Sequence, residues 1–413
     1  MPQTANQFNA HEQDVLPNGW SLKQLDHILD IRNGYAFKSK DFQKSGVLLI
    51  RQSNLTAKGI STNQAMHLPN DYLSRYSGYF IKNGDILIGM SGSIGRLSRY
   101  DLKQPALQNQ RTGLIKFLVP EYAEYATYYL MYIENELIAL AKGEAIKNIS
   151  AHQIKSCLIP LPPADQAKLI AAKTKSLLAP QQRAEEKLKR AEIDLYHYKK
   201  AVLHQALNNN PDVKRVKLGK VASVRHGYSL PYNIATVGGN HIPFFKVADL
   251  AQVDISETPY LNNAKLHVPI DTNTNTRLRP LQAGSIVFAK TGEAIKLNRR
   301  AILNVPSLID NNMMGVKSTS DRLDNTYLYY FLLSLSLEEV GRATTIPSIR
   351  KSDVEGILIP LPPLPEQLRI VTEIKRCYNL SDTLRKQLNH NLEQAKLLKQ
   401  SILKQAFNGR LLN

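Results

Sequence analysis

Basic and hydroxyl side chains gather in two loops of this chain, in residue types that proteins use to contact nucleic acid. Lys and Arg neutralise phosphates and supply the salt-dependent part of affinity, whereas polar side chains on loops reach base edges and specify sequence. Each loop follows a short apolar run, at 85–89 in the first half of the chain and at 283–288 in the second. The candidate contacts are Ser91, Ser93, Arg96 and Arg99 in the first loop, and Lys290, Thr291, Lys296, Asn298, Arg299 and Arg300 in the second. Solvated loops without a ligand remain the alternative for both.

Two Gly-Tyr pairs, Gly34-Tyr35 and Gly227-Tyr228, mark a second group of candidate contacts by the same reasoning. Its members are Tyr35, Lys38 and Lys40 in the first half of the chain, and Tyr228 and Tyr232 in the second. A third group consists of Arg51, Gln52 and Asn54, which correspond in position to the further candidate Lys246 and to Val247 and Asp249. The glycines of these pairs, together with Gly92 and Gly292, have a simpler explanation as turn residues with positive φ.

Residue patterns for catalysis are missing from the sequence. Pro162-Pro163 and Pro362-Pro363 lack the neighbouring Asn or Asp and the aromatic residue that an amino-methyltransferase motif requires. The segment 89–95, GMSGSIG, has neither the spacing of a phosphate-binding loop nor that of a dinucleotide fingerprint. The histidines follow no metal-ligand spacing, and the carboxylates form no nuclease cluster. We therefore nominate no catalytic, cofactor-binding or metal-binding residue and expect no enzyme activity from the chain itself, with a stand-alone nucleic-acid-modifying enzyme as the alternative.

The overall composition describes a folded protein with a strong positive charge. Of its 413 residues, 43% are hydrophobic and 21% are charged, which is ordinary globular usage. Its 53 Lys and Arg against 35 Asp and Glu give a formal charge of +18, and such a surplus attracts polyanions, of which nucleic acid is the usual one. Cys157 and Cys377 lack the pattern of a disulfide framework or zinc site, and no apolar run is long enough to span a membrane. We expect a cytoplasmic protein with a flexible N-terminal tail at residues 1–14.

The chain contains one unit written twice. Ile-Pro-Leu-Pro-Pro occurs at 159–163 and again at 359–363, a separation of 200 residues (359 minus 159). The segment AVLHQAL at 201–207 matches SILKQAF at 401–407 with the same separation. In each copy, short β-like runs separated by turn residues fill the first three quarters. This texture predicts a mixed domain of strands with a few helices.

After each Pro-Leu-Pro-Pro segment the composition changes to helix formers. Lys, Glu, Gln, Ala and Leu dominate from 165 to 207 and from 366 to 407, and steps of four and three between apolar residues predict a coiled coil. The predicted inner positions are Leu177, Ala184, Leu188, Ala191, Leu195, Tyr198 and Val202 in the first helix, and Leu384, Leu388, Asn391, Ala395, Leu398 and Ile402 in the second. We expect Pro180 to kink or split the first helix. Asn391 either fixes the register from a buried position or is simply exposed.

Two domains that each close on an Ile-Pro-Leu-Pro-Pro entry into a long helix resemble the specificity subunit of type I restriction-modification systems. The second copy, IPLPPLPEQ at 359–367, fits the family pattern best. The first copy, IPLPPADQ at 159–166, is one residue shorter, so we expect a compensating residue within the first helix. The resemblance covers about residues 15–410 of the chain.

The resemblance implies an α+β fold with two mixed α/β target recognition domains in tandem repeat, each followed by a long α-helix, and with the two helices paired as an antiparallel coiled coil. The expected boundaries are 15–160 and 211–360 for the recognition domains, and 161–210 and 361–413 for the spacer helices. It also implies a subunit that reads a bipartite, asymmetric site on double-stranded DNA, one half per domain. The helices would set the length of the spacer between the half-sites.

The catalytic chemistry would then lie in partner chains. The resemblance implies two modification subunits, which methylate adenine with S-adenosylmethionine, and restriction subunits, which depend on ATP and Mg²⁺. No cofactor is expected on this chain. Because the candidate loops differ between the two copies, the two half-sites are expected to differ as well. A scaffold protein whose coiled coil joins other proteins is a further alternative.

Overall fold

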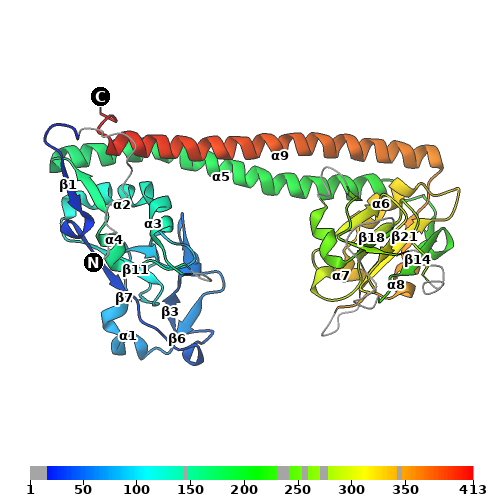
Figure 1. The fold of residues 1–413 in the computed structure, drawn as a ribbon, viewed down its shortest axis with the longest axis horizontal. Helices are drawn as coiled ribbons and strands as arrows, with labels where there is room; N and C mark the ends of the chain where they lie inside the picture. The colour runs from blue at the N-terminus through cyan, green and yellow to red at the C-terminus, as the bar shows by residue number, and fades with distance from the viewer. Residues whose placement is uncertain are drawn as a thin grey trace. The chain divides into compact units, whose positions relative to one another are not determined.

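The protein divides into two compact units, described here from a computed structural model. The first unit comprises Met1–Glu186 with Leu392–Asn413, and the second comprises Lys187–Asn391. Each unit therefore contains one globular domain and one part of each of two long helices (Figure 1). The structure describes residues 16–143, 147–229, 241–253, 259–269, 278–341 and 347–412. The tail predicted at residues 1–14 lies outside these ranges.

Domain 1, which runs from β1 to β12, is built on two four-stranded sheets. One sheet has the order β2-β11-β8-β9, and its strands are Leu29–Asn33, Thr112–Phe117, Ile86–Gly89 and Leu97–Arg99. The other has the order β6-β3-β10-β7, and its strands are Met66–Leu68, Val47–Ile50, Ala106–Gln108 and Phe80–Ile81. Two further pairs join β1 (Ser21–Gln24) to β12 (Leu158–Leu161) and β4 (Leu55–Thr56) to β5 (Gly59–Ile60). Both sheets contribute to the edge where the candidate loops lie.

Domain 2, which runs from β13 to β22, repeats this arrangement. Its larger sheet has the order β14-β21-β18-β19-β16, and its strands are Ala222–His226, Met313–Ser318, Ile286–Ala289, Arg300–Leu303 and Tyr260–Leu261. The second sheet has the order β17-β15-β20, and its strands are Leu266–Val268, Ile242–Phe245 and Leu308–Ile309. β13 (Arg215–Lys217) pairs with β22 (Leu358–Pro360). The repeat in the sequence is therefore also a repeat of strand order.

Short helices complete each domain. Those of domain 1 are α1 (Tyr72–Arg75), α2 (Ala123–Tyr132), α3 (Glu134–Leu140) and α4 (Ala151–Lys155), and those of domain 2 are α6 (Asn325–Ser334), α7 (Leu337–Val340) and α8 (Lys351–Glu355). Single 3-10 turns lie at Leu25–His27, Ser39–Asp41, Gln52–Asn54, Ser77–Tyr79, Pro120–Tyr122, Leu218–Lys220, Val247–Gln252 and Glu293–Ile295. The hydroxyl of Tyr125 in α2 donates to the Pro160 carbonyl at 2.6 Å, and that of Tyr327 in α6 donates to the Pro360 carbonyl at 3.0 Å. These bonds attach each proline-rich segment to its own domain.

The two long helices, α5 (Ala164–Asn208) and α9 (Leu364–Phe407), pack against each other antiparallel, as predicted. In the first unit, Gln181 Nε2 in α5 donates to the carbonyl of Ala395 in α9 at 3.0 Å. In the second unit, the Lys199 ammonium in α5 pairs with the carboxylate of Asp382 in α9. The partner's number falls in α9 as the residue number rises in α5, and this order defines an antiparallel pair.

Both helices enter the core of each unit. In the first unit, the Phe407 ring near the end of α9 contacts the rings of Tyr125 and Tyr129, with centroids 5.1 and 4.9 Å apart. In the second unit, Leu203 of α5 and Ile374 of α9 are buried in the core of domain 2. Burial of apolar area at this scale is the main stabilising contribution to such a fold. Each domain is therefore completed by the start of one helix and the end of the other.

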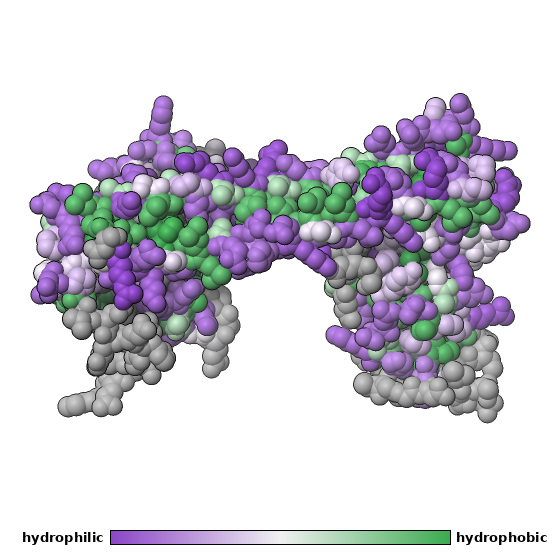
Figure 2. Space-filling view, turned by 90° about the horizontal axis from the view of Figure 1, so that it is seen from above, coloured by the Kyte–Doolittle hydropathy of each residue, from purple (hydrophilic) through white to green (hydrophobic). Residues whose placement is uncertain are grey.

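The buried face of the coiled coil differs in part from the predicted one. Leu388, Ala395 and Ile402 are shielded as predicted, whereas Leu384, Asn391 and Leu398 are exposed. The residues one position later, Arg385, Leu392 and Lys399, occupy the shielded places, and in α5 Glu185 and Lys199 replace the exposed Ala184 and Tyr198 in the same way. Long charged side chains can bury their aliphatic stems along the interface between two helices. The pattern of apolar residues in the sequence therefore pointed to the positions next to them. Apolar side chains therefore stay at the surface of the helices, as Figure 2 shows in green.

The predictions for Pro180 and for the entry to the first helix also need correction. Of the predicted kink or split at Pro180, the split is wrong, because α5 is one helix with Pro180 inside it. The compensating residue expected in α5 is not found either, because α5 and α9 begin 200 residues apart (364 minus 164) and the buried Ala167 and Gln367 keep that separation. The amides of both residues donate to the preceding proline carbonyl, of Pro163 and Pro363. Helical register is therefore equal in the two copies from the first turn onward.

Candidate nucleic-acid interface

In domain 1, several strands end at the same edge of the fold, and polar loops follow their ends. β2 ends at Asn33 opposite Gly113, and β8 ends at Gly89 opposite Thr112. β3 runs parallel to β10, and Ile50 lies beside Gln108 at the ends of both strands. We call the residues after these ends the polar edge of domain 1, which consists of Tyr35, Arg51, Gln52, Ser91, Gln110 and Arg111.

Domain 2 has a polar edge at the corresponding place. β14 ends at His226 opposite Met314, and β18 ends at Ala289 opposite Met313. β15 ends at Phe245, which lies beside Ile309 at the end of the parallel strand β20. The polar edge of domain 2 consists of His226, Tyr228, Lys246, Lys290, Thr291, Asn311 and Asn312. Candidate segments that are far apart in the sequence thus meet at one edge in each domain.

Gly34 and Gly227 permit the close backbone approach that forms each edge. A Cβ at Gly34 would lie 2.1 Å from the Asn109 carbonyl oxygen, and one at Gly227 would lie 2.0 Å from that of Asp310. Neither residue is in the positive-φ region, so the turn explanation for these two glycines is wrong and the missing side chain is what the structure requires. Gly92 and Gly292 do have positive φ, at 64° and 75°, as predicted.

Asn54 and Asp249 close the same local turn in the two domains. Asn54 Oδ1 accepts from the backbone amide of Arg51 at 2.9 Å, and Asp249 Oδ2 accepts from that of Lys246 at 2.7 Å. Asn54 also donates to the Ser61 carbonyl and is only 2% exposed. Among the sequence-predicted contacts of these turns, Lys246 is exposed, whereas Arg51 and Gln52 are half-buried and Asn54 has a structural position.

The loop after β8 in domain 1 is shielded by its neighbours. Arg111 Nη1 donates to Ser91 Oγ at 3.3 Å, and Ser91 is 1% exposed. Gln52 lies against Gly92, where an added Cβ would be 3.0 Å from Gln52 Nε2. Ser93 is half-buried, and Arg96 is exposed directly before β9. Arg96 is therefore the candidate of this loop that offers a cation at the surface near the polar edge.

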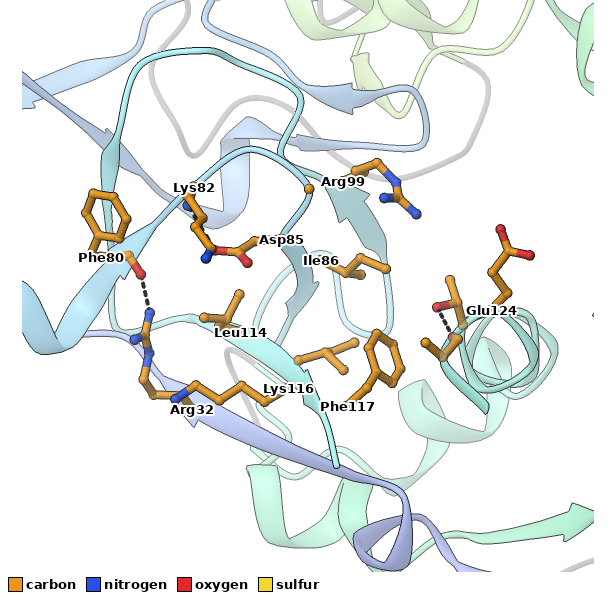
Figure 3. Close-up of a pocket in the computed structure, with 14 residues that line it drawn as sticks. Arg32, Phe80, Lys82, Asp85, Ile86, Arg99, Leu114, Lys116, Phe117 and Glu124 are labelled. Carbon is orange, nitrogen blue, oxygen red and sulfur yellow. Dashed lines mark hydrogen bonds between the residues drawn. The ribbon is translucent and has the colours of Figure 1, made fainter. Parts of the chain in front are cut away.

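Arg99 lies away from the polar edge, although the sequence groups it with the same loop. It pairs with Ile86 at the start of β8, at the opposite end from Gly89. There Arg99 lines a pocket of about 640 Å³ with Arg32, Asp85 and Glu124 among its neighbours (Figure 3). Arg32 Nη2 donates to the Phe80 carbonyl at 2.6 Å, and burial lowers its pKa. Because the lining carries both positive and negative side chains around an apolar floor, its electrostatic potential favours neither anionic nor cationic ligands.

The loop after β18 in domain 2 carries cations at the edge itself. Lys290 Nζ lies 3.4 Å from His226 Nδ1, and burial, followed by the charge of Lys290, lowers the pKa of His226. The imidazole is therefore mainly neutral at neutral pH. Thr291 Oγ1 donates to Asn312 Oδ1 at 2.8 Å. Lys296 pairs with Glu293 at 2.8 Å in the adjoining turn.

Asn298 and Arg300 act inside domain 2 rather than at its surface. Arg300 is 1% exposed, and its guanidinium donates to the carbonyls of Asn298 and Leu335, both at 2.8 Å. Burial lowers the pKa of Arg300 to about 10, which leaves it charged at neutral pH. Asn298 bonds to the Leu335 carbonyl and the Leu337 amide. The outer candidates of this loop are therefore the exposed Lys296 and the half-buried Lys290, Thr291 and Arg299.

Tyr35 belongs to an aromatic cluster that was not predicted from the sequence. Its ring contacts Phe37 at 4.9 Å, Tyr76 at 4.7 Å and Tyr79 at 5.2 Å between centroids. Arg75 lies over the Tyr76 ring at 5.9 Å. Tyr35 itself is 37% exposed, and the nearby Lys38 and Lys40 are exposed as well. Aromatic residues at 72, 76 and 79 next to a basic residue were the available sequence signal.

Tyr228 has a different environment from Tyr35. Its hydroxyl accepts from the Arg279 backbone amide at 3.1 Å, and Arg225 Nη2 approaches the same hydroxyl at 3.5 Å. Tyr228 is thereby fixed to the domain through its polar end and is half-buried. The remaining candidate of this group, Tyr232, lies outside the described residues.

The turn that connects the two sheets at each polar edge was also not predicted. It consists of Asn109, Gln110 and Arg111 between β10 and β11, and of Asp310, Asn311 and Asn312 between β20 and β21. Gln110, Arg111, Asn311 and Asn312 are all exposed. An Asn or Asp followed by polar residues between two apolar runs is a recognisable turn signal. Clusters of lysine and arginine do not point to this turn.

Comparison with known proteins identifies the family. The model of the "Type I restriction modification DNA specificity domain" matches residues 17–193 and again residues 210–394. The chain belongs to this family. Each match contains one globular domain with most of the long helix that follows it, so the specificity domain as a family unit includes its helix.

Relatives of the specificity-domain family match the chain over nearly its whole length. The EcoBI specificity subunit of Escherichia coli is 22% identical over 95% of this chain and 86% of its own. The putative MjaX specificity subunit of Methanocaldococcus jannaschii is 25% identical over 98% of this chain and 96% of its own. A chain solved for complex assembly and conformational transition of the type I R-M system has a TM-score of 0.72 at 19% identity, covering 96% of this chain and 99% of that one. This last likeness shows that the fold is shared.

Two further kinds of feature are absent from the described part of the specificity-domain chain. Among the residues that the structure describes, no group of three or more His, Cys, Asp or Glu side chains could hold a metal ion. Within the same residues, no helix has the length and apolar character needed to cross a membrane.

Proposed function

We propose that this protein is the DNA sequence-recognition subunit of a type I restriction-modification complex. Each domain reads one half of a bipartite, asymmetric site on double-stranded DNA through its polar edge. The observation that carries this proposal is the repetition of one framework with different side chains at the same edge. A repeated framework supports the same docking on two half-sites, whereas different side chains at the edge support two different sequences.

The charge distribution supports a polyanionic ligand. The chain has a formal charge of +18, and exposed cations such as Arg96, Lys246 and Arg111 lie at or beside the polar edges. Cations in these positions would neutralise phosphates and fix the register of the duplex, and the neighbouring amides and hydroxyls would then reach base edges.

In this proposal the chain is not catalytic, and its partners perform the chemistry. Two modification subunits would attach to the two equivalent copies of the unit and methylate adenine with S-adenosylmethionine, and restriction subunits that need ATP and Mg²⁺ would join them. Exposed leucines on α9, including Leu380, Leu384 and Leu398, support a role of the helices in holding other chains. The complex would act in the cytoplasm, where the chromosome is accessible.

Adenine-methylation mapping of the host genome tests the proposal. We expect one bipartite motif, with a fixed spacer between two specified halves, to lose methylation when the gene is deleted and to regain it on complementation. A matched deletion of a modification subunit should remove the same motif. Unchanged methylation of every bipartite motif in the deletion strain would contradict the proposed function.

Salt dependence of DNA binding gives a second, biochemical test. The complex of this chain with its modification subunits should bind a duplex that carries the motif, and the logarithm of the binding constant should fall linearly with the logarithm of salt concentration. A slope near zero would contradict phosphate contacts at the polar edges.

A further inference from the structure

The turn at the centre of each polar edge is held by backbone bonds from two sheets. In domain 1, the Asn109 amide donates to the Ile50 carbonyl at 2.9 Å, and the Met90 amide donates to the Arg111 carbonyl at 3.1 Å. The Tyr35 amide adds a bond to the Gln108 carbonyl at 3.0 Å. The turn is thereby tied to β3, to the loop after β8 and to the segment after β2.

The turn of domain 2 is held by the corresponding bonds. The Asp310 amide donates to the Phe245 carbonyl at 2.9 Å, and the Lys290 amide donates to the Asn312 carbonyl at 2.9 Å. The Tyr228 amide donates to the Ile309 carbonyl at 2.8 Å. Because these bonds use backbone groups, the position of the turn does not depend on the side chains at its tip.

The side chains on these turns have the chemistry of base recognition. Arg presents paired donors to the O6 and N7 atoms of guanine, whereas Asn and Gln match the N6 and N7 atoms of adenine. Gln110 and Asn311 occupy the same tip position, 201 residues apart (311 minus 110), and both are exposed. Arg111 and Asn312 occupy the next position.

The neighbouring hydroxyl orients the second side chain of each turn. Ser91 Oγ accepts from Arg111 Nη1 at 3.3 Å, and Thr291 Oγ1 donates to Asn312 Oδ1 at 2.8 Å. Asn312 Nδ2 also donates to Asp310 Oδ1 at 2.8 Å, so this amide is engaged at both ends. Arg111 keeps further N–H donors beyond the one that Ser91 receives. Such preorganisation on a rigid frame is what a specific site needs.

We infer that the β10–β11 and β20–β21 turns are base-reading turns of the two domains. Gln110 and Arg111 contact an adenine and a guanine in the half-site of domain 1, and Asn311 contacts an adenine in the half-site of domain 2. This inference rests on the proposed function and identifies which side chains determine the two sequences.

The test uses the assembled complex with its modification subunits and a duplex library randomised over both half-sites. Arg111→Ala should make one base pair of the domain 1 half-site degenerate, with discrimination falling roughly 5- to 150-fold at that position. Arg111→Lys keeps the charge but loses the paired geometry, so it should lose most of the same discrimination while retaining affinity. Asn311→Ala should relax one position in the other half-site only.

Matched controls are Gln104→Ala in domain 1 and Asn304→Ala in domain 2. Both residues are exposed and lie by strand ends remote from the polar edges, before β10 and after β19. They should leave every position of the motif unchanged. Thermal unfolding of each variant complex establishes that the edge is still folded.

The outcomes separate this inference from the proposed function. A wild-type complex without any preferred bipartite sequence would overturn the proposed function. A wild-type complex with a clear motif, whose preferences are the same in Arg111→Lys, Gln110→Ala and Asn311→Ala, would overturn the inference alone. An equal loss of affinity for all sequences in Arg111→Ala would also overturn it, because that result describes a phosphate contact.

Discussion

The two domains form the same hydrogen bonds at their polar edges but present different side chains there. In domain 1, Tyr35 packs in an aromatic cluster, whereas Tyr228 in domain 2 is fixed through its hydroxyl. In domain 1, the loop hydroxyl accepts from a guanidinium, whereas in domain 2 the corresponding hydroxyl bonds to an amide. Because the common bonds are made by the backbone, side chains at the edge can change without loss of the framework. One fold can therefore carry two specificities.

The two units also differ in the polar contacts of the coiled coil. The first unit has a neutral bond from Gln181 to the carbonyl of Ala395, whereas the second has an ion pair between Lys199 and Asp382, with Lys199 also over the Tyr378 ring at 5.0 Å. A shielded ion pair favours one partner and one orientation of the helices, but removal of either charge leaves the other charge buried and unpaired. This contrast predicts different sensitivities of the two units to substitution.

Asp382→Ala should cost more stability than the corresponding change in the first unit. It leaves the Lys199 ammonium in a seam where the side chain is only 18% exposed, and losing one partner of a shielded pair costs about 3 kcal/mol. Gln181→Ala, the corresponding change in the first unit, removes the bond to the Ala395 carbonyl and a bond to the Glu185 carboxylate within α5, and it should cost about 1 kcal/mol. Urea unfolding of the full chain measures both.

The double variant Lys199→Met with Asp382→Leu is the control for this comparison. It removes both charges and keeps apolar volume in the seam, so it should recover most of the stability that Asp382→Ala loses. Equal losses in Asp382→Ala and Gln181→Ala would contradict the difference between the units.

Arg300 is an internal cation of domain 2 and Lys290 lies at its surface, so substitutions of these two residues should have different effects. Arg300→Ala removes a large buried side chain and its hydrogen bonds to the Asn298 and Leu335 carbonyls, although the Leu335 carbonyl keeps a donor in Asn298 Nδ2. The free energy of unfolding should therefore fall by about 3 kcal/mol. Lys290→Ala should change stability by about 0.5 kcal/mol or less and should reduce the salt slope of duplex binding by about 1. Urea unfolding and binding at several salt concentrations measure the two effects. A destabilised Lys290→Ala with an unchanged salt slope would contradict this assignment.

Local signals in the sequence predicted the elements that depend on local order. Four consecutive apolar residues at 47–50 form β3, and helix formers after each proline-rich segment form α5 and α9. The repeat separation of 200 residues holds along the helices because both copies keep one register (364 minus 164). These features are determined by neighbouring residues and are therefore accessible without the fold.

Features that depend on residues far apart in the sequence could not be predicted from local patterns. Arg300 resembles a surface cation until α6 and α7 bring the Leu335 carbonyl against it. Gly34 resembles a turn glycine until the pairing of β3 with β10 places Asn109 beside it. Arg385 and Lys399 look like surface residues in the sequence, because only the packed partner helix shows that their aliphatic stems are shielded. In each case a second chain segment decides the role.

The smallest expected difference between the domains is a pH effect at His226, whose counterpart in domain 1 is Asn33. Burial, then Lys290 and Lys351, lower the pKa of His226, while Glu355 raises it. As the pH falls through about 6.5, the unfolded chain therefore takes up this proton before the folded chain does. The contribution of His226 to the free energy of unfolding is present above that pH and is lost as the pH falls towards the pKa of the folded state. His226→Asn should remove this loss, seen as a smaller drop in the urea midpoint between about pH 7.5 and pH 5.5. Lys290→Met should act in the same direction, because it removes the cation that disfavours the imidazolium. An equal drop in the wild type and in His226→Asn would show that the pH dependence of domain 2 comes from other groups.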